Sequence, residues 1–510
     1  MAKTLSVGII GAGPGGLALG IFLRKAGFDD FTIFDREDGV GGTWRVNTYP
    51  GLACDVKSHL YSYSFDLNPR WSRMWSGGQA EILEYFERCA RRYRLDAHLR
   101  LNTEIVSARW DTASRTWRLG TATGEEFTFD VVVSAIGIFT QPVMPDLVEE
   151  EPFTGTLMHT ARWDHSVDLR DARVAVLGTG STAAQLVPEV ARVASKVYSV
   201  QRSSTWVLPK PDRPYTEREK WLFAHVPLAK KIYRTRLWLR SESNISVIEN
   251  GSDKTQEFKG IALRTLEATI PPDEELRAKL TPPTHPFGCK RLVFATDYLQ
   301  TLNQPHVEVV SSPARTLRAR SVITEDGTEL DVDVVLCATG YAAADYLGQI
   351  EVQGADGTAL RDTWRDGAFA YLGMAVPGYP QLLHALRTEH QRRLQQRHLH
   401  ARGAGPLHRA CAEVHAPQGQ AYIEVRAEVM QRFLTRIDTW MQGTVWLTRC
   451  SNYFRAANGR VVTQWPRSAR AFWGLTRWFR PSDYTFSETS GSSGSRRDIR
   501  VGGVQTAVKR

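Results

Sequence analysis

Residues 5–35 read LSVGIIGAGPGGLALGIFLRKAGFDDFTIFD and decide the fold of the first part of the chain. The apolar run over 5–10 predicts a buried strand, and the apolar-rich run over 15–26 predicts a helix. Between them lies a glycine-rich turn made by Gly11, Gly13, Gly15 and Gly16. The first glycine permits a tight turn, the second lets a pyrophosphate approach the backbone, and the third lets helix and strand pack closely. The stretch therefore predicts a dinucleotide-binding unit.

A second strand is expected over residues 31–34, ending at Asp35. A carboxylate there can bind both hydroxyls of an adenosine ribose. The N-terminus of the preceding helix presents N–H groups and a partial positive charge to the phosphates. A glycine-rich turn without a ligand is the alternative, and the complete order of strand, turn, helix, strand and acid favours a bound dinucleotide.

The run from residue 6 to residue 23 is almost wholly apolar, so a signal peptide or a membrane span must be considered. Six glycines in this run argue against both, and the charged end at Arg24 and Lys25 leads to Gly27 rather than to a cleavage site. We expect a cytoplasmic protein without stable membrane insertion.

The composition is that of an ordinary globular protein, with 42% hydrophobic and 23% charged residues. At 510 residues the chain is too long for one core, so two or three domains are expected. Its six cysteines include no CxxC pair. This pattern argues for a reducing compartment and excludes a disulfide reductase or an iron–sulfur protein.

A second glycine-rich turn follows an apolar strand expected over 173–177, and its nucleotide-contacting residues are Gly178, Gly180, Ser181 and Thr182. The next strand, over 196–200, ends at Arg202 and Ser203 with no acid. An acid there would hold a 2′-hydroxyl and repel a 2′-phosphate, whereas arginine offers a forked cation to the phosphate. The second site therefore predicts NADPH, with a surface arginine that binds nothing as the alternative.

Residues 41–51, GGTWRVNTYPG, followed by Asp55, resemble the flavin-contacting loop of FAD-dependent monooxygenases. Most members of that group have Glu where this chain has Asp35, and the shorter acid should still bind the ribose. The resemblance implies that the first dinucleotide is FAD. Beyond the first turn and Asp35, the residues implied to bind it are Gly42, Thr43, Trp44, Asp55, Tyr61 and Ile105.

Between the two turns, residues 153–164 read FTGTLMHTARWD, with the spacing FxGxxxHxxxWD. This resembles the complete fingerprint of type I Baeyer–Villiger monooxygenases. The related N- and S-oxygenating flavin monooxygenases usually have Tyr or Phe where this chain has Trp163. We interpret the segment as a hinge between two moving domains, and His159 as a hydrogen-bonded joint rather than a base.

The loop HPFGCKR at 285–291 resembles the family loop that bears the active-site arginine, here Arg291. The resemblance implies that Asp55 pairs with this arginine and that Lys290 reaches the NADPH 2′-phosphate. Without the family context, a solvated basic pair would be the favoured interpretation of Lys290 and Arg291.

The chemistry implied by the resemblance has four steps. NADPH reduces FAD, O2 adds to give a C4a-peroxyflavin, the peroxide attacks a ketone carbonyl, and the adduct rearranges to an ester or lactone. The cofactors carry the hard chemistry. Arg291 would stabilise the negative charge as a permanent, preorganised cation. We expect a ketone or another lipophilic small molecule as the substrate, together with O2, and the sequence reveals neither the ketone nor the oligomeric state.

We therefore expect an α/β fold with two Rossmann-like dinucleotide-binding domains, of which the FAD domain is split in sequence. Its first part is expected at 1–150 and its second at 331–486. The NADP domain is expected at 151–330, with a helical insertion at 206–285. We place the return of the chain to the FAD domain at residue 331 because an apolar strand that ends in glycine is expected at 333–340.

Two segments stand apart from this plan. The tail 487–510 is rich in Ser, Gly and Arg and is expected to be disordered. Residues 381–420 hold six of the 13 histidines and six arginines, but no Phe, Trp, Tyr, Asp or Lys. A metal site at His398 and His400 is one interpretation, and a nucleic-acid patch would need interleaved aromatics. We favour neither, and expect no metal and no nucleic acid.

A compensated reading-frame shift over 381–422 explains this segment better. Family members have here a loop resembling GPNT and a helix resembling SVIYMxEAQxxYI. Codons permitted for 381–409 and read from the second base give SFFMLYGPNTNGGSSSVIYMHEAQARYIV. In the family this loop lies against the flavin ring, where the helix dipole favours the reduced anion. A real shift would damage the site, and an error in the sequence text would leave the enzyme intact.

Three hypotheses remain open at this point. The first is the FAD- and NADPH-dependent ketone monooxygenase. The second is an N- or S-oxygenating flavin monooxygenase, which Trp163 and Asp164 disfavour. The third is an inactive nucleotide-binding remnant, favoured only if the frame shift is real.

Overall fold

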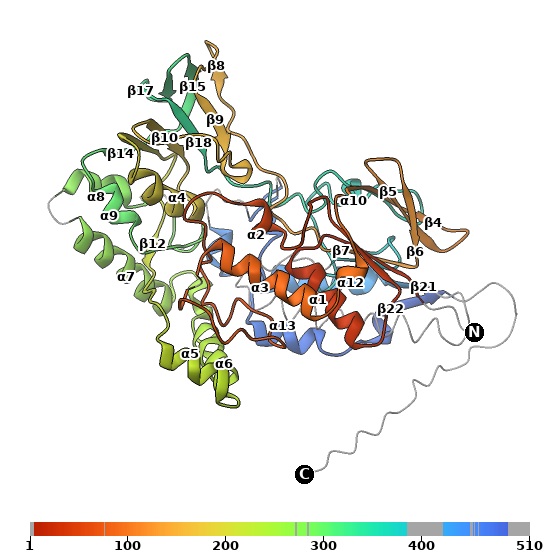
Figure 1. The fold of residues 1–510 in the computed structure, drawn as a ribbon. Coiled ribbons are helices and arrows are strands. Elements are labelled where there is room, and N and C mark those ends of the chain that lie inside the picture. Colours follow the sequence, from red (N-terminus) through yellow and green to blue (C-terminus); the bar gives the residue numbers. More distant parts are fainter. Residues whose placement is uncertain are drawn as a thin grey trace, which may run out of the picture.

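The computed structural model describes residues 5–487 except 76, 271–272, 283–284, 385–421, 449–451, 453 and 457. The structure is built on two five-stranded parallel sheets with helices packed on them and smaller sheets attached (Figure 1). The expected tail lies outside the described residues, apart from Ser487. Of the segment expected to be frame-shifted, only Gln381–His384 and Tyr422 are described.

The first sheet contains the first glycine turn. Its spatial order is β3-β2-β1-β7-β20, all parallel. The strands are β1 (Val7–Ile10), β2 (Phe31–Phe34), β3 (Leu99–Arg100), β7 (Val131–Ser134) and β20 (Leu382–His384). Each parallel neighbour needs a crossover, and α1 (Pro14–Lys25) provides the one between β1 and β2. Helix α3 (Gln79–Arg92) packs beside α1.

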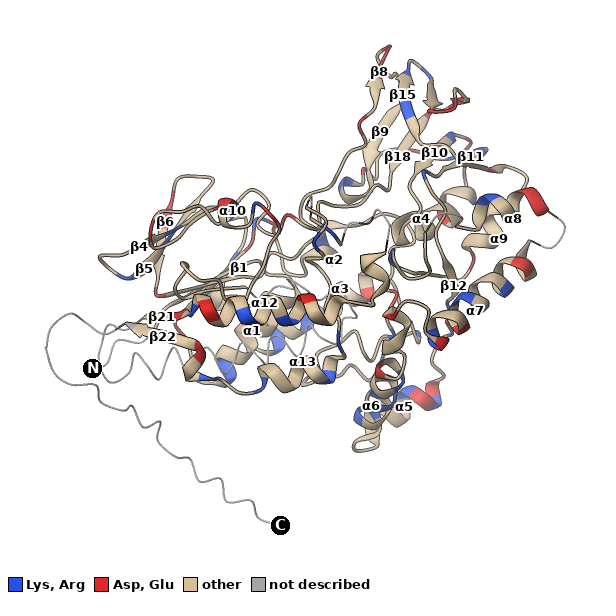
Figure 2. Cartoon of the chain, turned by 180° about the vertical axis from the view of Figure 1, so that it is seen from behind, with Lys and Arg blue, Asp and Glu red and all other residues tan. Residues whose placement is uncertain are grey.

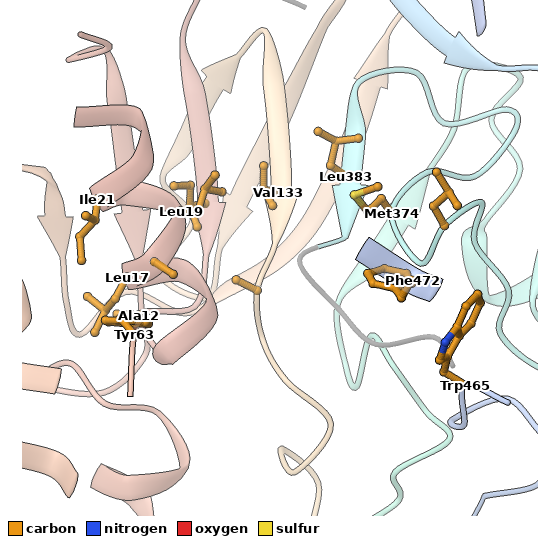
Figure 3. Packing of buried hydrophobic residues seen from close by; sticks show 14 of the residues in the cluster. Ala12, Leu17, Leu19, Ile21, Tyr63, Val133, Met374, Leu383, Trp465 and Phe472 are labelled. Atoms are coloured by element: carbon orange, nitrogen blue, oxygen red, sulfur yellow. The ribbon is translucent and has the colours of Figure 1, made fainter. Parts of the chain in front are cut away.

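The core of this domain joins residues from both ends of the chain. Helix α12 (Ala427–Met441) places apolar side chains at helical spacing into it, at Val429, Met430, Phe433, Ile437 and Met441. Helix α13 (Ala469–Thr476) adds the buried Phe472. Figure 3 shows Leu17 and Leu19 of α1, Val133 of β7 and Leu383 of β20 in the same cluster as Trp465 and Phe472. The domain is therefore split in sequence.

The second sheet contains the second glycine turn. Its spatial order is β14-β11-β10-β18-β9, again all parallel. The strands are β9 (Thr156–His159), β10 (Arg173–Leu177), β11 (Lys196–Val200), β14 (Val307–Val310) and β18 (Val334–Cys337). Helices α4 (Ser181–Ala191) and α9 (Tyr298–Leu302) pack against each other beside it.

The expected return to the first domain at residue 331 is wrong by one strand. Val334–Cys337 is β18 and pairs with β10 and β9, so it belongs to the second sheet. An apolar run such as VVLC fits any central parallel strand, and the sequence therefore could not tell which sheet receives it. The chain leaves the second sheet only after this strand.

Four-stranded sheets with both antiparallel and parallel pairs extend both domains. In the first domain, β19-β4-β5-β6 comprises β4 (Ile105–Asp111), β5 (Thr116–Thr121), β6 (Glu126–Phe129) and β19 (Glu351–Gln353). In the second, β17-β16-β15-β8 comprises β8 (Val148–Glu149), β15 (Ala314–Arg318), β16 (Ser321–Thr324) and β17 (Glu329–Asp331). An antiparallel pair of β21 (Tyr422–Val425) and β22 (Tyr484–Ser487) joins the ends of the C-terminal part.

Residues 206–285 are mainly helical, as the sequence predicts. The helices are α5 (Glu217–His225), α6 (Ala229–Glu242), α7 (Asp253–Thr269) and α8 (Glu274–Leu280), and β12 (Val207–Pro209) pairs with β13 (Val293–Ala295). The helical pattern over 217–239 is broken by Pro227 and by Leu228, whose φ is 65°. Within the described ranges, no helix has the length and apolarity needed to cross a bilayer.

Candidate active site

The first glycine turn has no room for larger residues. Gly11 has a φ of 108°, and a Cβ there would lie 2.7 Å from the carbonyl oxygen of Ala135. A Cβ on Gly16 would lie 1.9 Å from the carbonyl oxygen of Gly11. These two positions bring α1 close to the end of β1. Gly13 is different, because a Cβ there would meet no atom closer than 3.6 Å. The absence of a side chain at Gly13 is therefore not required by packing inside the protein, and it leaves open space beside the turn.

The helices that follow the two turns have open N-termini. In the described part of the chain, no side chain caps α1 or α4, whereas Thr216 caps α5 and Ser252 caps α7. The first N–H groups of an uncapped helix are available to an anion. Asp35 lies beside the first turn and accepts a hydrogen bond from the Ala12 amide at 2.6 Å. Burial raises the pKa of this carboxyl group.

The second turn repeats the geometry of the first. Gly178 has a φ of 129°, and a Cβ there would lie 2.5 Å from the carbonyl oxygen of Ala338. Gly180 has no atom within 4 Å of such a Cβ. Positively charged side chains lie next to this second turn. The Lys290 ammonium donates to the Ser203 hydroxyl at 2.6 Å.

Lys290 and Arg202 form a basic pair at this turn. Burial, and then the charge of Arg202, lower the pKa of Lys290. Within the described residues, neither side chain forms a salt bridge with a carboxylate. Two cations and a hydroxyl at the end of β11 are a suitable cradle for a phosphate group.

A cleft of about 1860 Å³ lies between the two domains and unites most of the expected residues. Those that line it are Thr43, Trp44, Asp55, Tyr61, Gly178, Gly180, Ser181, Thr182, Arg202, Ser203, Lys290 and Arg291. Those outside its lining are Gly11, Gly13, Gly15, Gly16, Asp35, Gly42 and Ile105. Ile105 begins β4, and its side chain is buried in the core beneath the antiparallel sheet.

Arg291 and Asp55 meet at the wall of the cleft, although 236 positions separate them in the chain. The guanidinium donates from Nη2 and Nε to Asp55 Oδ2, at 2.5 and 3.2 Å. The Asp55 side chain is 11% exposed and that of Arg291 is 37% exposed. The carboxylate is thus held in the protein while the guanidinium faces the cleft.

Aromatic residues of the flavin-contacting loop form a rigid wall. The Trp44 indole donates to the Tyr61 hydroxyl at 2.6 Å, and the two rings meet edge to face. Tyr341, which follows the glycine at the end of β18, donates to Asn47 at 2.7 Å. No local pattern singles out Asn47 or Tyr341, because the partners are almost 300 positions apart.

Gln185 is a further residue that the sequence interpretation missed. It lies on α4 and connects the two domains, because its side chain accepts from the Tyr49 hydroxyl at 3.0 Å and donates to the Ala53 carbonyl at 2.9 Å. Gly51 lies so close that a Cβ there would be 2.4 Å from the Gln185 carbonyl oxygen. A signal was present, since Gln185 follows Ser181 by one helical turn and so shares its face of α4.

The segment 153–164 forms the edge strand β9 of the second sheet and the turn that follows it. His159 is buried, accepts the Ala161 amide at Nδ1 (3.0 Å), and packs edge to face with Tyr341. Burial lowers its pKa. His159 does not line the cleft, whereas His165, just beyond the segment, hydrogen-bonds Thr48 of the first domain. This geometry supports the interpretation of His159 as a hydrogen-bonded structural residue of the hinge rather than a catalytic base.

Comparisons with known proteins agree with this architecture. Residues 8–221 match the family model described as pyridine nucleotide-disulphide oxidoreductase. A Baeyer–Villiger monooxygenase of Pseudomonas aeruginosa is 36% identical over 494 residues, covering 96% of this chain and 92% of the relative. A Baeyer–Villiger monooxygenase of Streptomyces coelicolor is 36% identical, with 92% and 90% covered.

Solved structures give the same result. The closed crystal structure of a cyclohexanone monooxygenase superposes with a TM-score of 0.81 at 25% identity, covering 96% of this chain and all of the other. An oxidised steroid monooxygenase bound to NADP superposes with a TM-score of 0.79 at 25% identity, with 93% and 97% covered.

Proposed function

This chain belongs to the Baeyer–Villiger monooxygenase family, and from that premise we propose that its cleft oxidises a lipophilic ketone to an ester or lactone. The protein is an FAD- and NADPH-dependent monooxygenase that uses O2 as the oxygen donor. When bound, the two cofactors supply the reducing electrons and the activated oxygen. The residues of the chain bind the cofactors, orient the substrate and exclude water.

The two turns fit the pyrophosphate groups of two dinucleotides. Gly13 and Gly180 leave open space where a phosphate must approach, and the helix N-termini beyond them are uncapped in the described structure. Asp35 is placed to receive the ribose hydroxyls at the first turn. Arg202, Ser203 and Lys290 would bind a 2′-phosphate at the second, which the contact between Lys290 and Ser203 supports. These features support FAD at the first turn and NADPH at the second.

The observation that carries the proposal is the pair of Arg291 and Asp55 at the wall of the cleft between the two turns. Asp55 fixes the orientation of the guanidinium. Arginine stays charged, so it can stabilise negative charge that develops on the carbonyl oxygen of the ketone. A cation that is already in position needs no rearrangement during the reaction.

The rest of the cleft is suited to an apolar substrate. Its lining includes the aromatic residues Trp75, Phe258, Phe294, Trp446 and Phe454. An apolar wall excludes water from the reacting groups and strengthens the electrostatic effect of Arg291. The same wall favours a hydrophobic ketone over a charged substrate.

The test is product analysis with the purified chain, using cyclohexanone, a thioether and NADPH. We expect flavin absorbance and the lactone as the main product. Arg291→Ala should lower lactone formation by about 100-fold or more, while hydride transfer from NADPH is retained. Lys279→Ala, at an exposed cation on α8, is the matched control and should leave the rate unchanged.

Two outcomes would reject the proposal. Sulfoxide formation without lactone would identify an S-oxygenating enzyme. A colourless protein without flavin absorbance would identify an inactive nucleotide-binding remnant, the result expected of a real frame shift over 381–422.

A further inference from the structure

The hairpin formed by α5 and α6, residues 217–242, projects from the edge of the molecule away from both parallel sheets (Figure 1). Large apolar side chains are exposed around its tip. Trp221 is 59% exposed, Leu228 is 60% exposed and Ile232 is 58% exposed. Leu222, Val226 and Leu239 are also exposed. Apolar side chains gathered in this way on one projection mark an interaction surface.

Helix α6 has apolar side chains on two faces. Its inner face packs against the protein through Tyr233 and the buried Leu237. Its outer face carries Ile232 and Leu239, in line with Leu228 before the helix, at spacings of four and seven residues. A helix on the surface of a globular protein needs only one apolar stripe, so the outer stripe has no role in the fold of this chain.

The hairpin is also strongly basic. Residues 217–242 contain seven Lys or Arg and three Glu, and blue stretches of ribbon mark these helices in Figure 2. Glu217 pairs with Lys220 and Glu219 with Arg213, each at 2.7 Å, and Glu242 accepts the amides of Ala469 and Arg470 at 3.2 Å. In the part of the chain that the structure describes, the basic residues without a salt bridge are Arg218, Lys230, Lys231, Arg236 and Arg240.

We propose that the α5–α6 hairpin docks reversibly on the surface of a membrane that contains anionic lipids. Exposed tryptophan and aliphatic side chains enter the headgroup boundary, and neighbouring Lys and Arg bind the lipid phosphates. The apolar residues lie on a projecting tip, which suits a deformable lipid surface. A protein partner would need a matching hollow.

Docking in this way would place the cleft next to the bilayer. The lining of the cleft includes Leu237, Arg240 and Ser241 of α6, so the hairpin lies between the outer surface and the site. A lipophilic substrate dissolved in the membrane could then reach the cleft without crossing bulk water. The proposal concerns the location of the protein and does not depend on which compound it oxidises.

The test is flotation of the full-length, flavin-loaded chain with lipid vesicles. Vesicles of phosphatidylcholine are compared with vesicles in which about one third of the lipid is phosphatidylglycerol. We expect binding to the anionic vesicles that weakens as salt is raised. Trp221→Ser combined with Leu228→Ser and Ile232→Ser should lower the partition at least tenfold, and Lys231→Glu with Arg236→Glu should do the same.

Matched changes elsewhere keep the test specific. Val148→Ser with Val193→Ser removes exposed apolar side chains from the second domain, and Arg91→Glu with Arg109→Glu makes the same change in net charge. These variants should bind vesicles like the parent. Retained flavin and an unchanged circular dichroism spectrum show that each variant is folded.

Three results would overturn the proposal. The first is the absence of vesicle binding by the parent, and the second is equal loss of binding in the hairpin variants and their controls. The third is a dimer that the hairpin substitutions convert to a monomer, measured by light scattering, without any effect of lipid. That result would assign the surface to a second copy of the chain.

Discussion

The two parallel sheets share their strand arrangement and their glycine turn, and they differ in the side chains at three positions. In each sheet the strand that leads into the glycine turn, β1 or β10, lies in the middle, and a glycine with positive φ follows it, Gly11 at 108° and Gly178 at 129°. A Cβ on either would collide with the carbonyl oxygen of an alanine that follows the neighbouring strand, Ala135 or Ala338. The backbone therefore defines a dinucleotide turn, and side chains elsewhere must distinguish the two sites.

The three differences lie at the turn, at the ribose and at the edge of the sheet. The third small residue of the turn is Gly16 in the first domain and Ala183 in the second. The strand that follows the turn and its helix leads to Asp35 in one sheet and to Arg202 in the other. The edge strands end at His384 and His159. Each difference can be tested by substitution.

The largest effect is expected at the third position of the turn. Gly16→Ala would place a Cβ 1.9 Å from the Gly11 carbonyl oxygen, so α1 and β1 would have to separate. We expect a loss of about 3 kcal/mol or more of stability and loss of FAD, measured as flavin retained after gel filtration. The reciprocal change, Ala183→Gly, should cost only about 1 kcal/mol. Equal effects of the two changes would show that the turns pack alike.

A smaller effect is expected at the ribose. Arg202→Ala and Lys290→Ala should each raise the KM for NADPH by about 10- to 100-fold, since a hydrogen bond to a charged group contributes about 1.5–3 kcal/mol. The KM for NADH should stay unchanged, because NADH has no 2′-phosphate. Arg192→Ala, at the end of α4, is the control. Equal increases for both nucleotides would contradict a role in phosphate binding.

The two sheets also show what sequence can and cannot predict. The turns, Asp35 and Arg202 were identified because local spacing determines a strand, a turn and the residue that ends the next strand. The pairing of Asp55 with Arg291 was expected from the family resemblance, since spacing gives no information on contacts between distant positions. The placement of β18 and the role of Gln185 depend on tertiary packing, and no local pattern encodes them.

The two edge strands, β9 and β20, differ in how well their terminal histidines are hydrogen-bonded. In the second sheet, His159 is buried at the end of β9 and accepts the Ala161 amide at Nδ1, whereas its Nε2 has no hydrogen-bond partner among the described residues. In the first sheet, His384 is buried at the equivalent end of β20, and neither of its ring nitrogens has a hydrogen-bond partner among the described residues. The buried Gln381 side chain is in the same situation. Buried polar groups without a partner, at the end of β20 and just before it, are costly to the fold.

This contrast supports the hypothesis of a shifted reading frame, whose larger part lies outside the described residues. The shifted text replaces Gln381–His384 by Ser, Phe, Phe and Met, which leaves one small hydroxyl and three apolar groups in the strand. Peptide mass spectrometry across 381–423 on protein from the native source is the direct measurement. A peptide containing GPNT would restore the intact segment, and peptides that match the printed sequence would end the hypothesis.

The smallest effect is expected from His384→Met, which removes a buried polar group without a partner. Because such a group costs about 1–3 kcal/mol, the variant should be more stable by a similar amount at pH 7.5, measured by urea denaturation. The difference should grow on acidification. Burial lowers the pKa of His384 to about 4 from its ordinary 6.5, so the folded state favours the neutral ring.

Because the folded state favours the neutral ring of His384, the stability of the protein should fall as the pH falls. The unfolded chain binds a proton near pH 6.5 that the folded chain does not, so stability is present above pH 6.5 and is lost as the pH falls toward 4, by up to about 1.4 kcal/mol per pH unit. His384→Met removes the contribution of His384 to the pH dependence of stability. The pH dependence that remains comes from other buried groups such as His59, whose pKa burial lowers to about 3. His225→Met, at an exposed histidine of α5, is the control and should leave the slope unchanged. A variant of equal or lower stability across this range would show that His384 is satisfied by a partner and that β20 fits its core as well as β9 does.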